Sequence, residues 1–203
     1  MGTYMHERLP GICTIAAAAI LSVGAAGADG LDVKGTARTG TRPASNAVVW
    51  LEAPNAPGSP QTQKVVLHQR SLTFAPHVLA VRVGTTVDFP NEDRVFHNVF
   101  SFHDGKVFDL GIYPVGSLKR VVFSEPGVSR VFCNIHPHMA GYVVAVDSPY
   151  FSAVDQSGAF TIRAVSPGTY TYRAWRPGGP ILSGSVVIQA ASVLDIVWPR
   201  EPS

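Results

Sequence analysis

Short apolar runs separated by turn-forming residues dominate the chain after residue 28. The runs are rich in β-branched and aromatic residues, with Gly, Pro, Asn or Asp between them, a pattern that predicts short strands. No stretch in this region keeps a helical period. The sequence therefore predicts an all-β fold, a sandwich or barrel instead of a parallel sheet with crossover helices. The clearest predicted strands are residues 48–51, 78–83, 119–123, 130–133 and 141–146.

The first 28 residues have a different character. A short segment containing Arg8 is followed by an apolar run at 12–21 and by the small residues Ala26-Gly27-Ala28, the features of a cleaved export signal. The run is too short to span a bilayer as a permanent helix, and an uncleaved membrane anchor is the alternative. We therefore expect a signal peptide at 1–28 and a periplasmic or otherwise exported protein without a permanent membrane span.

Removal of that signal leaves one cysteine, Cys133, so the predicted mature chain cannot form an internal disulfide. A free thiol in an oxidising compartment is a liability unless something, such as a metal, holds it. The mature chain has 15 basic and 13 acidic residues and keeps a net charge of +2. Nothing in this balance indicates a nucleic acid or an anionic membrane surface as a partner.

Two segments carry the candidate metal ligands: His97, and then Cys133, His136 and Met139 about 35 residues later. One thiolate, two imidazoles and one thioether are the ligands of a mononuclear type 1 copper site. Three of them lie in one loop and the fourth must come from a distant strand, which a β-sandwich can supply. Zinc is the alternative metal, but a tetrahedral zinc site would usually add a second Cys or a carboxylate, and a thioether is a poor zinc ligand. The sequence predicts one type 1 copper ion.

The other histidines are weaker candidates. His138 lies between two predicted ligands, where successive side chains of a tight loop point in different directions, so we expect it at the surface, with metal contact left open. His68, His77 and His103 have no paired spacing and are expected to be ordinary loop residues.

At these segments the chain resembles the plastocyanin and amicyanin-like blue copper proteins. Cys133-x-x-His136-Pro137-x-Met139 resembles the amicyanin ligand loop, and His97-Asn98-Val99 resembles the first-histidine motif of plastocyanin-like cupredoxins. The similarity covers roughly residues 64–147 and extends to proteins labelled methylamine utilisation proteins. It implies a cupredoxin-like Greek-key β-sandwich at 63–148, with Asn98 tying the first-histidine strand to the ligand loop. It also implies that His136 reaches the surface within an apolar patch.

The remaining residues resemble a carboxypeptidase-regulatory-like β-sandwich. Residues 155–175 resemble its second half, and residues 33–51 supply its first half. We therefore predict a second small β-sandwich that is split into 29–62 and 149–203, with the cupredoxin inserted between the halves. The alternative is that the N-terminal strands extend the cupredoxin. Because no triad or paired acid/base motif accompanies this module, support or docking is favoured over catalysis.

Four protein ligands leave no open metal position for a substrate, which favours electron transfer over catalysis. Copper storage or delivery is the alternative, but such sites are usually rich in Met or His, and the predicted mature chain has only Met139. Multicopper oxidases and nitrite reductases need additional His clusters. The sequence thus predicts a non-enzymatic electron carrier whose partner is a redox protein, such as a c-type cytochrome or a periplasmic dehydrogenase.

Overall fold

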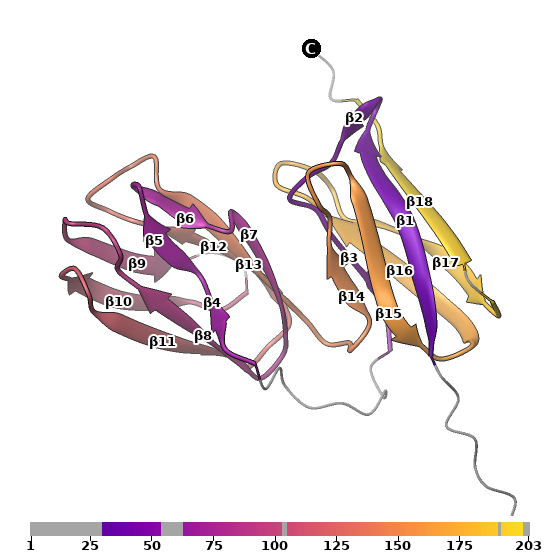
Figure 1. Cartoon of the computed structure of the whole chain (residues 1–203), viewed down its shortest axis with the longest axis horizontal. Helices are drawn as coiled ribbons and strands as arrows, with labels where there is room; N and C mark the ends of the chain where they lie inside the picture. The colour runs from indigo at the N-terminus through magenta and orange to yellow at the C-terminus, as the bar shows by residue number, and fades with distance from the viewer. Residues whose placement is uncertain (1–29, 54–62, 103–104, 191, 201–203) are drawn as a thin grey trace, which may run out of the picture.

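The computed structural model describes residues 30–53, 63–102, 105–190 and 192–200, and it builds them from strands arranged in two lobes (Figure 1). The predicted signal peptide and His103 lie outside the described residues. None of the described residues forms a helix long and apolar enough to cross a membrane. The prediction of an all-β fold is confirmed.

One lobe, residues 65–146, is called the first sandwich here. Its two main sheets enclose a core that includes Phe89, Phe123, Val131 and Val143, each fully buried. A short hairpin lies beside them. The larger sheet has the order β10 (Phe108–Tyr113), β9 (His97–Ser101), β12 (Gly127–Phe132), β13 (Ala140–Val146) and β7 (Val78–Arg82); the smaller has β11 (Leu118–Phe123), β8 (Thr85–Pro90) and β4 (Val65–Val66); the hairpin is β5 (His68–Arg70) and β6 (Thr73–Ala75).

The other lobe, the second sandwich, is made from both ends of the described chain. Its core includes Val33 and Leu51 from the N-terminal part and Ile162, Ile188 and Trp198 from the C-terminal part. One sheet has the order β15 (Ala159–Val165), β1 (Leu31–Thr39) and β18 (Ser192–Trp198), with β2 (Arg42–Pro43) paired to β1; the other has β14 (Phe151–Ala153), β3 (Val48–Leu51), β16 (Gly168–Trp175) and β17 (Leu182–Ile188).

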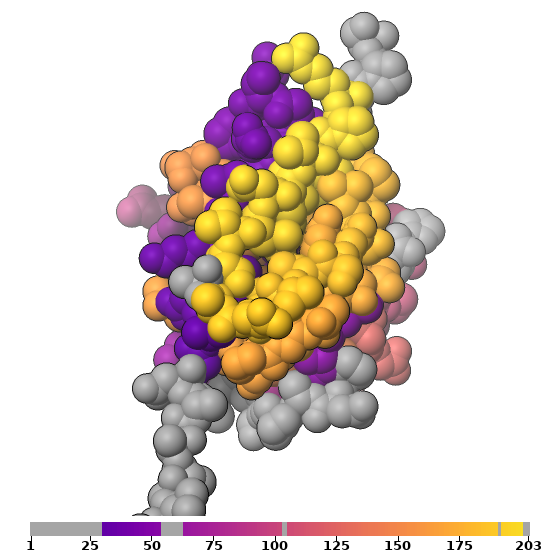
Figure 2. All heavy atoms as spheres, turned by 90° about the vertical axis from the view of Figure 1, so that its right-hand side faces the viewer, coloured from indigo at the N-terminus to yellow at the C-terminus, as the bar shows by residue number. Residues whose placement is uncertain are grey.

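Strand β1 joins the two ends of the chain. It pairs antiparallel with β15 and parallel with β18, where Gly35 lies opposite Leu194. A Cβ atom on Gly35 would lie 2.0 Å from the Leu194 carbonyl oxygen and 2.5 Å from the Phe160 ring, so only glycine permits this close approach. Figure 2 shows the C-terminal strands, in yellow and orange, beside the indigo N-terminal segments on the outer face of this sandwich.

Strand β13 explains how the two sandwiches meet. Successive side chains of a strand point to opposite faces. Val143 and Ala145 therefore enter the core of the first sandwich, whereas Val144 and Val146 pack against Val48 and Trp175 of the second. Both faces of β13 are covered, which accounts for its nearly continuous apolar sequence.

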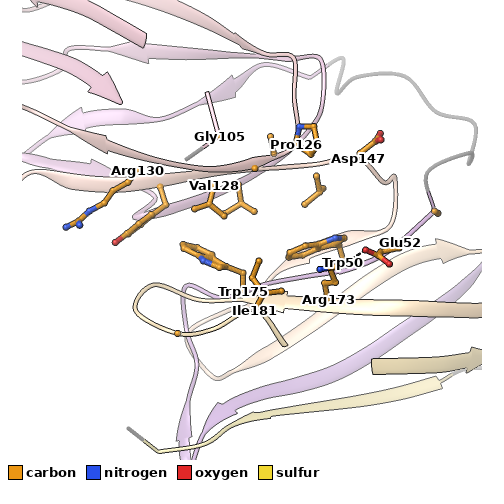
Figure 3. Close-up of a pocket in the computed structure, with 17 residues that line it drawn as sticks. Trp50, Glu52, Gly105, Pro126, Val128, Arg130, Asp147, Arg173, Trp175 and Ile181 are labelled. Atoms are coloured by element: carbon orange, nitrogen blue, oxygen red, sulfur yellow. Dashed lines mark hydrogen bonds and ion pairs between the residues drawn. The ribbon is translucent and has the colours of Figure 1, made fainter. Parts of the chain in front are cut away.

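A cavity of about 950 Å³ lies next to this interface. Trp50 and Trp175 form part of one wall, together with the ion pair between Arg173 and Glu52 (Figure 3). Val128 and Arg130 of β12 lie on the opposite wall, with Tyr142 of β13 also lining the cavity. Domain interfaces are common places for such cavities.

Candidate metal centre

Three of the four predicted ligands, His97, Cys133 and His136, come together at one end of the first sandwich. His97 is the first residue of β9, and Cys133 follows the last residue of β12. Since β9 and β12 are neighbours in the sheet, with Phe132 opposite Phe100, the strand pairing brings the distant histidine to the loop. His136 lies within the loop, and Met139 immediately precedes β13.

Three donor atoms form a compact group. The Nδ1 atoms of His97 and His136 are 3.1 Å apart, and the Cys133 Sγ lies 3.8 Å from each of them. In the part of the chain that the structure describes, one group of three or more His, Cys, Asp or Glu side chains could hold a metal ion, and it consists of these three residues. A thiol and two imidazole nitrogens at one point are the donors that copper prefers, and they also suit zinc.

Met139 lies in the same part of the core. Its side chain is buried, and it belongs with Cys133 to the hydrophobic cluster of the first sandwich. The loop closes on itself through the main chain, because the Met139 N–H donates to the His136 carbonyl at 2.9 Å and the Cys133 N–H donates to the Met139 carbonyl at 3.2 Å. The position of all four predicted ligands is thus fixed by one short loop and one strand.

Asn98 holds the loop to the adjacent strand. Its side-chain Oδ1 accepts a hydrogen bond from the Asn134 N–H at 2.7 Å, and Asn98 itself is buried. This contact joins β9 to the residue that follows Cys133. The predicted tie between the first-histidine strand and the ligand loop is confirmed.

Asp93 is a further contact of the site. Its Oδ2 lies 2.9 Å from Nε2 of His97, the ring nitrogen that does not face Cys133. The same carboxylate accepts hydrogen bonds from the N–H groups of Ser71 at 2.6 Å and Leu72 at 2.9 Å. Burial raises the pKa of Asp93, but the hydrogen bonds from Leu72, His97 and Ser71 outweigh it, so the pKa lies below its ordinary value. The carboxylate is therefore ionised at neutral pH.

The turn that holds Asp93 has an unusual backbone. Ser71 and Leu72 form the two-residue loop between β5 and β6, and both have positive φ, 53° and 56°. Such a loop usually carries Asn and Gly. Non-glycine residues in this conformation cost on the order of 1–3 kcal/mol each, and such strain gathers at functional sites.

A buried polar network lies on the strand next to His97. Tyr113 lies opposite His97 in the pairing of β10 with β9, and its hydroxyl donates to the Phe89 carbonyl at 3.2 Å. Gln69 Nε2 donates to the Tyr113 hydroxyl at 2.5 Å. Burial raises the pKa of Tyr113 well above its usual range, so the phenol stays protonated and keeps its hydrogen bond to the Phe89 carbonyl.

The site lies close to an apolar part of the surface. His97 is fully buried, whereas His136 is only half-buried. The loops and strand ends around them expose large apolar side chains: Val95 and Phe96 before β9, Ile112 and Val115 at the end of β10, and Ile135 in the ligand loop.

The other histidines of the described ranges, His68, His77 and His138, are not part of the three grouped donor side chains. His138 is exposed, with its ring centre 6.4 Å from that of His136, as predicted for a surface residue. His68 pairs with Glu92 at 2.6 Å, and the His77 ring packs edge-on against Tyr142.

An aromatic stack next to Cys133 was not foreseen from the sequence. Phe132 stacks on Phe100 and Phe102, with ring centres 5.6 and 5.4 Å away, and the Arg130 guanidinium lies 4.7 Å from the centre of the Phe132 ring. Phe100 and Phe102 are two residues apart, as are Arg130 and Phe132. This spacing was the signal in the sequence, since alternate residues of a strand share one face of a sheet. Asp93 was also missed, and its only signal was its place four residues before His97.

The strand order and the ligand end together define a cupredoxin-like β-sandwich joined to a second, smaller β-sandwich. The sequence resembles methylamine utilization protein MauL of Methylorubrum extorquens, with 35% identity over 60 residues, which cover 29% of this chain and 53% of MauL. The chain thus spans about half the length of that relative. This match confirms the resemblance to methylamine utilisation proteins.

Solved structures similar to this chain include copper proteins. A copper-containing nitrite reductase from Thermus scotoductus is 28% identical, with a TM-score of 0.40, over 46% of this chain and 25% of the reductase. A purple cupredoxin from Nitrosopumilus maritimus is 30% identical, with a TM-score of 0.36, over 41% of this chain and 98% of its own. A reduced amicyanin variant is 21% identical, with a TM-score of 0.39, over 48% of this chain and 98% of its own.

A domain family also matches the C-terminal part of the chain. Residues 142–195 fit the family described as polysaccharide lyase family 4, domain II. The matched region begins within β13 and runs through most of the C-terminal half of the second sandwich. Its description differs from the carboxypeptidase-regulatory-like module that the sequence suggested.

Proposed function

We propose that this chain is an exported type 1 copper protein that carries single electrons between redox partners. The main support for this proposal is that His97 Nδ1, His136 Nδ1 and Cys133 Sγ lie within 3.1 to 3.8 Å of one another. When bound, copper would supply a one-electron couple between Cu(II) and Cu(I). The resemblance of the ligand segments to plastocyanin and amicyanin-like blue copper proteins supports this proposal, which extends it to a particular ligand set.

The four predicted residues would hold the ion in different ways. Cys133 would supply the thiolate, His97 and His136 the imidazole nitrogens, and Met139 the weak thioether ligand. The Asp93 contact fits this assignment, because an Nε2–H donated to the carboxylate leaves Nδ1 of His97 without a proton. The donor set fits copper better than zinc, since no second Cys or carboxylate joins the group of donors in the described residues.

The surface around His136 would receive a partner protein. His136 is half-buried, and Phe96 next to His97, Val115 after β10 and Ile135 in the ligand loop expose large apolar side chains. A partner that covers these side chains would come close to the ligand histidine without a substrate entering the site. We propose a redox protein, such as a c-type cytochrome or a periplasmic dehydrogenase, as this partner, and an electron carrier instead of an enzyme.

We also propose that the chain consists of two domains, with the cupredoxin at 63–148 inserted into a sandwich made from 29–62 and 149–203. Separate cores support this division, as does the pairing of β1 with β15 and β18. The second sandwich would support or dock the copper domain.

An optical spectrum of the copper-loaded protein tests the proposed site. The oxidised protein should show intense visible charge transfer from thiolate to copper, and Cys133→Ser should abolish it because a hydroxyl cannot replace the sulfur interaction. His138→Ala is the matched control within the same loop and should preserve the band. A band that survives Cys133→Ser would remove the site.

Stopped-flow mixing with a chemically reduced cytochrome c tests the electron carriage. We expect reversible reduction by one electron per bound copper and no product from oxygen or nitrite alone. A copper centre that stays oxidised for minutes with several cytochromes would contradict electron transfer and favour copper storage or delivery.

A further inference from the structure

Asp93 links a remote hairpin to a predicted copper ligand. One carboxylate oxygen accepts the Ser71 N–H, and the other accepts the Leu72 N–H and contacts Nε2 of His97. The Asp93 N–H in turn donates to the side chain of Asn91, at 3.1 Å. The carboxylate is therefore held in place by the chain on either side of it and by two main-chain donors from another element.

The hairpin presents its donors because of its backbone conformation. Successive main-chain N–H groups in such turns can form a concave site for an anion. Here Ser71 and Leu72 both adopt positive φ, although neither is the Gly or Asn that usually occupies such a turn. The anion that this turn binds is the side chain of Asp93, which brings the negative charge to the buried ring of His97.

The contact determines where the proton of His97 lies. His97 is fully buried, so the ionised carboxylate is the acceptor for its Nε2–H. This tautomer leaves Nδ1 of His97 with a free lone pair directed at the donor group, and a proton on Nδ1 of His136, 3.1 Å away, would complete a hydrogen bond to it. A carboxylate that accepts the second ring N–H orients a ligand histidine and increases its basicity.

We propose that Asp93, held by the β5–β6 turn, is a positioning residue that fixes the tautomer of His97 and strengthens Nδ1 as a metal ligand. The inference rests on the proposed copper site. The negative charge of Asp93 against the His97 ring stabilises the more highly charged oxidised ion, so Asp93 favours Cu(II) over Cu(I). The turn at Ser71 and Leu72 thereby acts on the reduction potential without touching a ligand.

Asp93→Asn tests the proposal, with Glu92→Gln as the matched control. Both substitutions remove one carboxylate charge from the same loop, but Glu92 contacts His68 and not His97. In the copper-loaded full chain, Asp93→Asn should raise the ratio of Cu(I) to Cu(II) at a fixed applied potential by about tenfold or more. Glu92→Gln should change that ratio by less than about twofold. Equal effects of the two variants would overturn the proposal.

A double-mutant cycle tests the part played by the turn. Insertion of one glycine between Ser71 and Leu72 should separate the two donors and raise the same ratio in the wild-type background. In the Asp93→Asn background it should have no further effect, because the two changes act through one contact. Additive effects would show that the turn does not act through Asp93. Replacement of Ser71-Leu72 by Asn-Gly keeps both donors and should leave the ratio unchanged.

Nuclear magnetic resonance of the metal-free protein gives a readout independent of copper. Nitrogen-15 correlation spectra should show His97 with its proton on Nε2 and His136 with its proton on Nδ1. A proton on Nδ1 of His97 would overturn the positioning role. A wild-type protein with this tautomer but without thiolate charge transfer would contradict the proposed function and leave the contact with Asp93 intact.

Discussion

The Asn134 N–H donates to the side chain of Asn98 across 2.7 Å, and this contact joins the ligand loop to the neighbouring strand. The two residues contribute differently: Asn98 supplies a buried side chain, whereas Asn134 supplies its main chain and exposes its side chain. The loop that carries Cys133 and His136 is therefore held by a group that a single substitution can remove.

Asn98→Ala should destabilise the ligand loop. The substitution leaves the Asn134 N–H without its acceptor, which costs about 1–3 kcal/mol. Thermal unfolding of the copper-loaded protein should occur at a lower temperature, with a broadened charge-transfer band. Asn134→Ala retains the main-chain donor and should behave like the wild type. Equal destabilisation by the two variants would contradict this assignment.

A charge on the apolar surface should slow electron exchange. Val115 is 55% exposed beside the strand that pairs with His97, so Val115→Glu should reduce the rate of reduction by a cytochrome by about tenfold because partner docking is weakened. The visible spectrum should stay unchanged. Val193→Glu is the control, since Val193 is 75% exposed on the second sandwich. Stopped-flow rates that fall equally in both variants would argue against docking near His136.

Gly35→Ala should open the second sandwich while it spares the first. The new Cβ would meet the Leu194 carbonyl and the Phe160 ring, and relief of such overpacking typically costs about 1–3 kcal/mol. Hydrogen exchange should become faster in β1 and β18 but not in β9. Lys34→Ala, at the exposed neighbouring position, should have little effect. Equal loss of protection in both sandwiches would show that the two unfold as one unit.

Trp175→Ala should weaken the contact between the sandwiches. Trp175 is 8% exposed, and its ring packs edge-on against Tyr142 with the centres 5.2 Å apart. Truncation of a buried Trp costs about 3–5 kcal/mol. Small-angle scattering should show a larger radius of gyration, with the charge-transfer band retained. Val187→Ala, on an exposed part of β17, should leave both measurements unchanged.

The sequence predicted the regular strands well because their apolar residues face a core. The strand predicted at 48–51 coincides with β3, and the one at 141–146 falls within β13. The predicted strand at 130–133 extends one residue too far, since β12 ends at Phe132 and leaves Cys133 in the loop. The change from strand to loop depends on hydrogen bonding, which the apolar pattern does not reveal.

The predicted ligands could be recognised because they belong to short sequence motifs. His97, Cys133 and His136 come together as expected, because ligand spacing and residue type are visible in the sequence. Asp93 was not predictable, since its role depends on the hairpin about 20 residues earlier. That hairpin was itself missed, because Ser71-Leu72 lacks the Gly or Asn that normally indicates a turn with positive φ.

The pairing of β1 with β18 also determines the order in which the protein can mature. Thr36 bonds to the side chain of Asp195, 159 residues later in the chain. During synthesis from the N-terminus, the residues of the first sandwich all emerge before β18 exists. Apart from its short pairing with β2, strand β1 thus waits with both edges unpaired, and an unpaired edge is a template for pairing with another copy. Its exposed Lys34 and Arg38 place like charges on one face of the strand and oppose such exchange. The second sandwich, although it contains the first strand of the described residues, is the last part of the described structure to close.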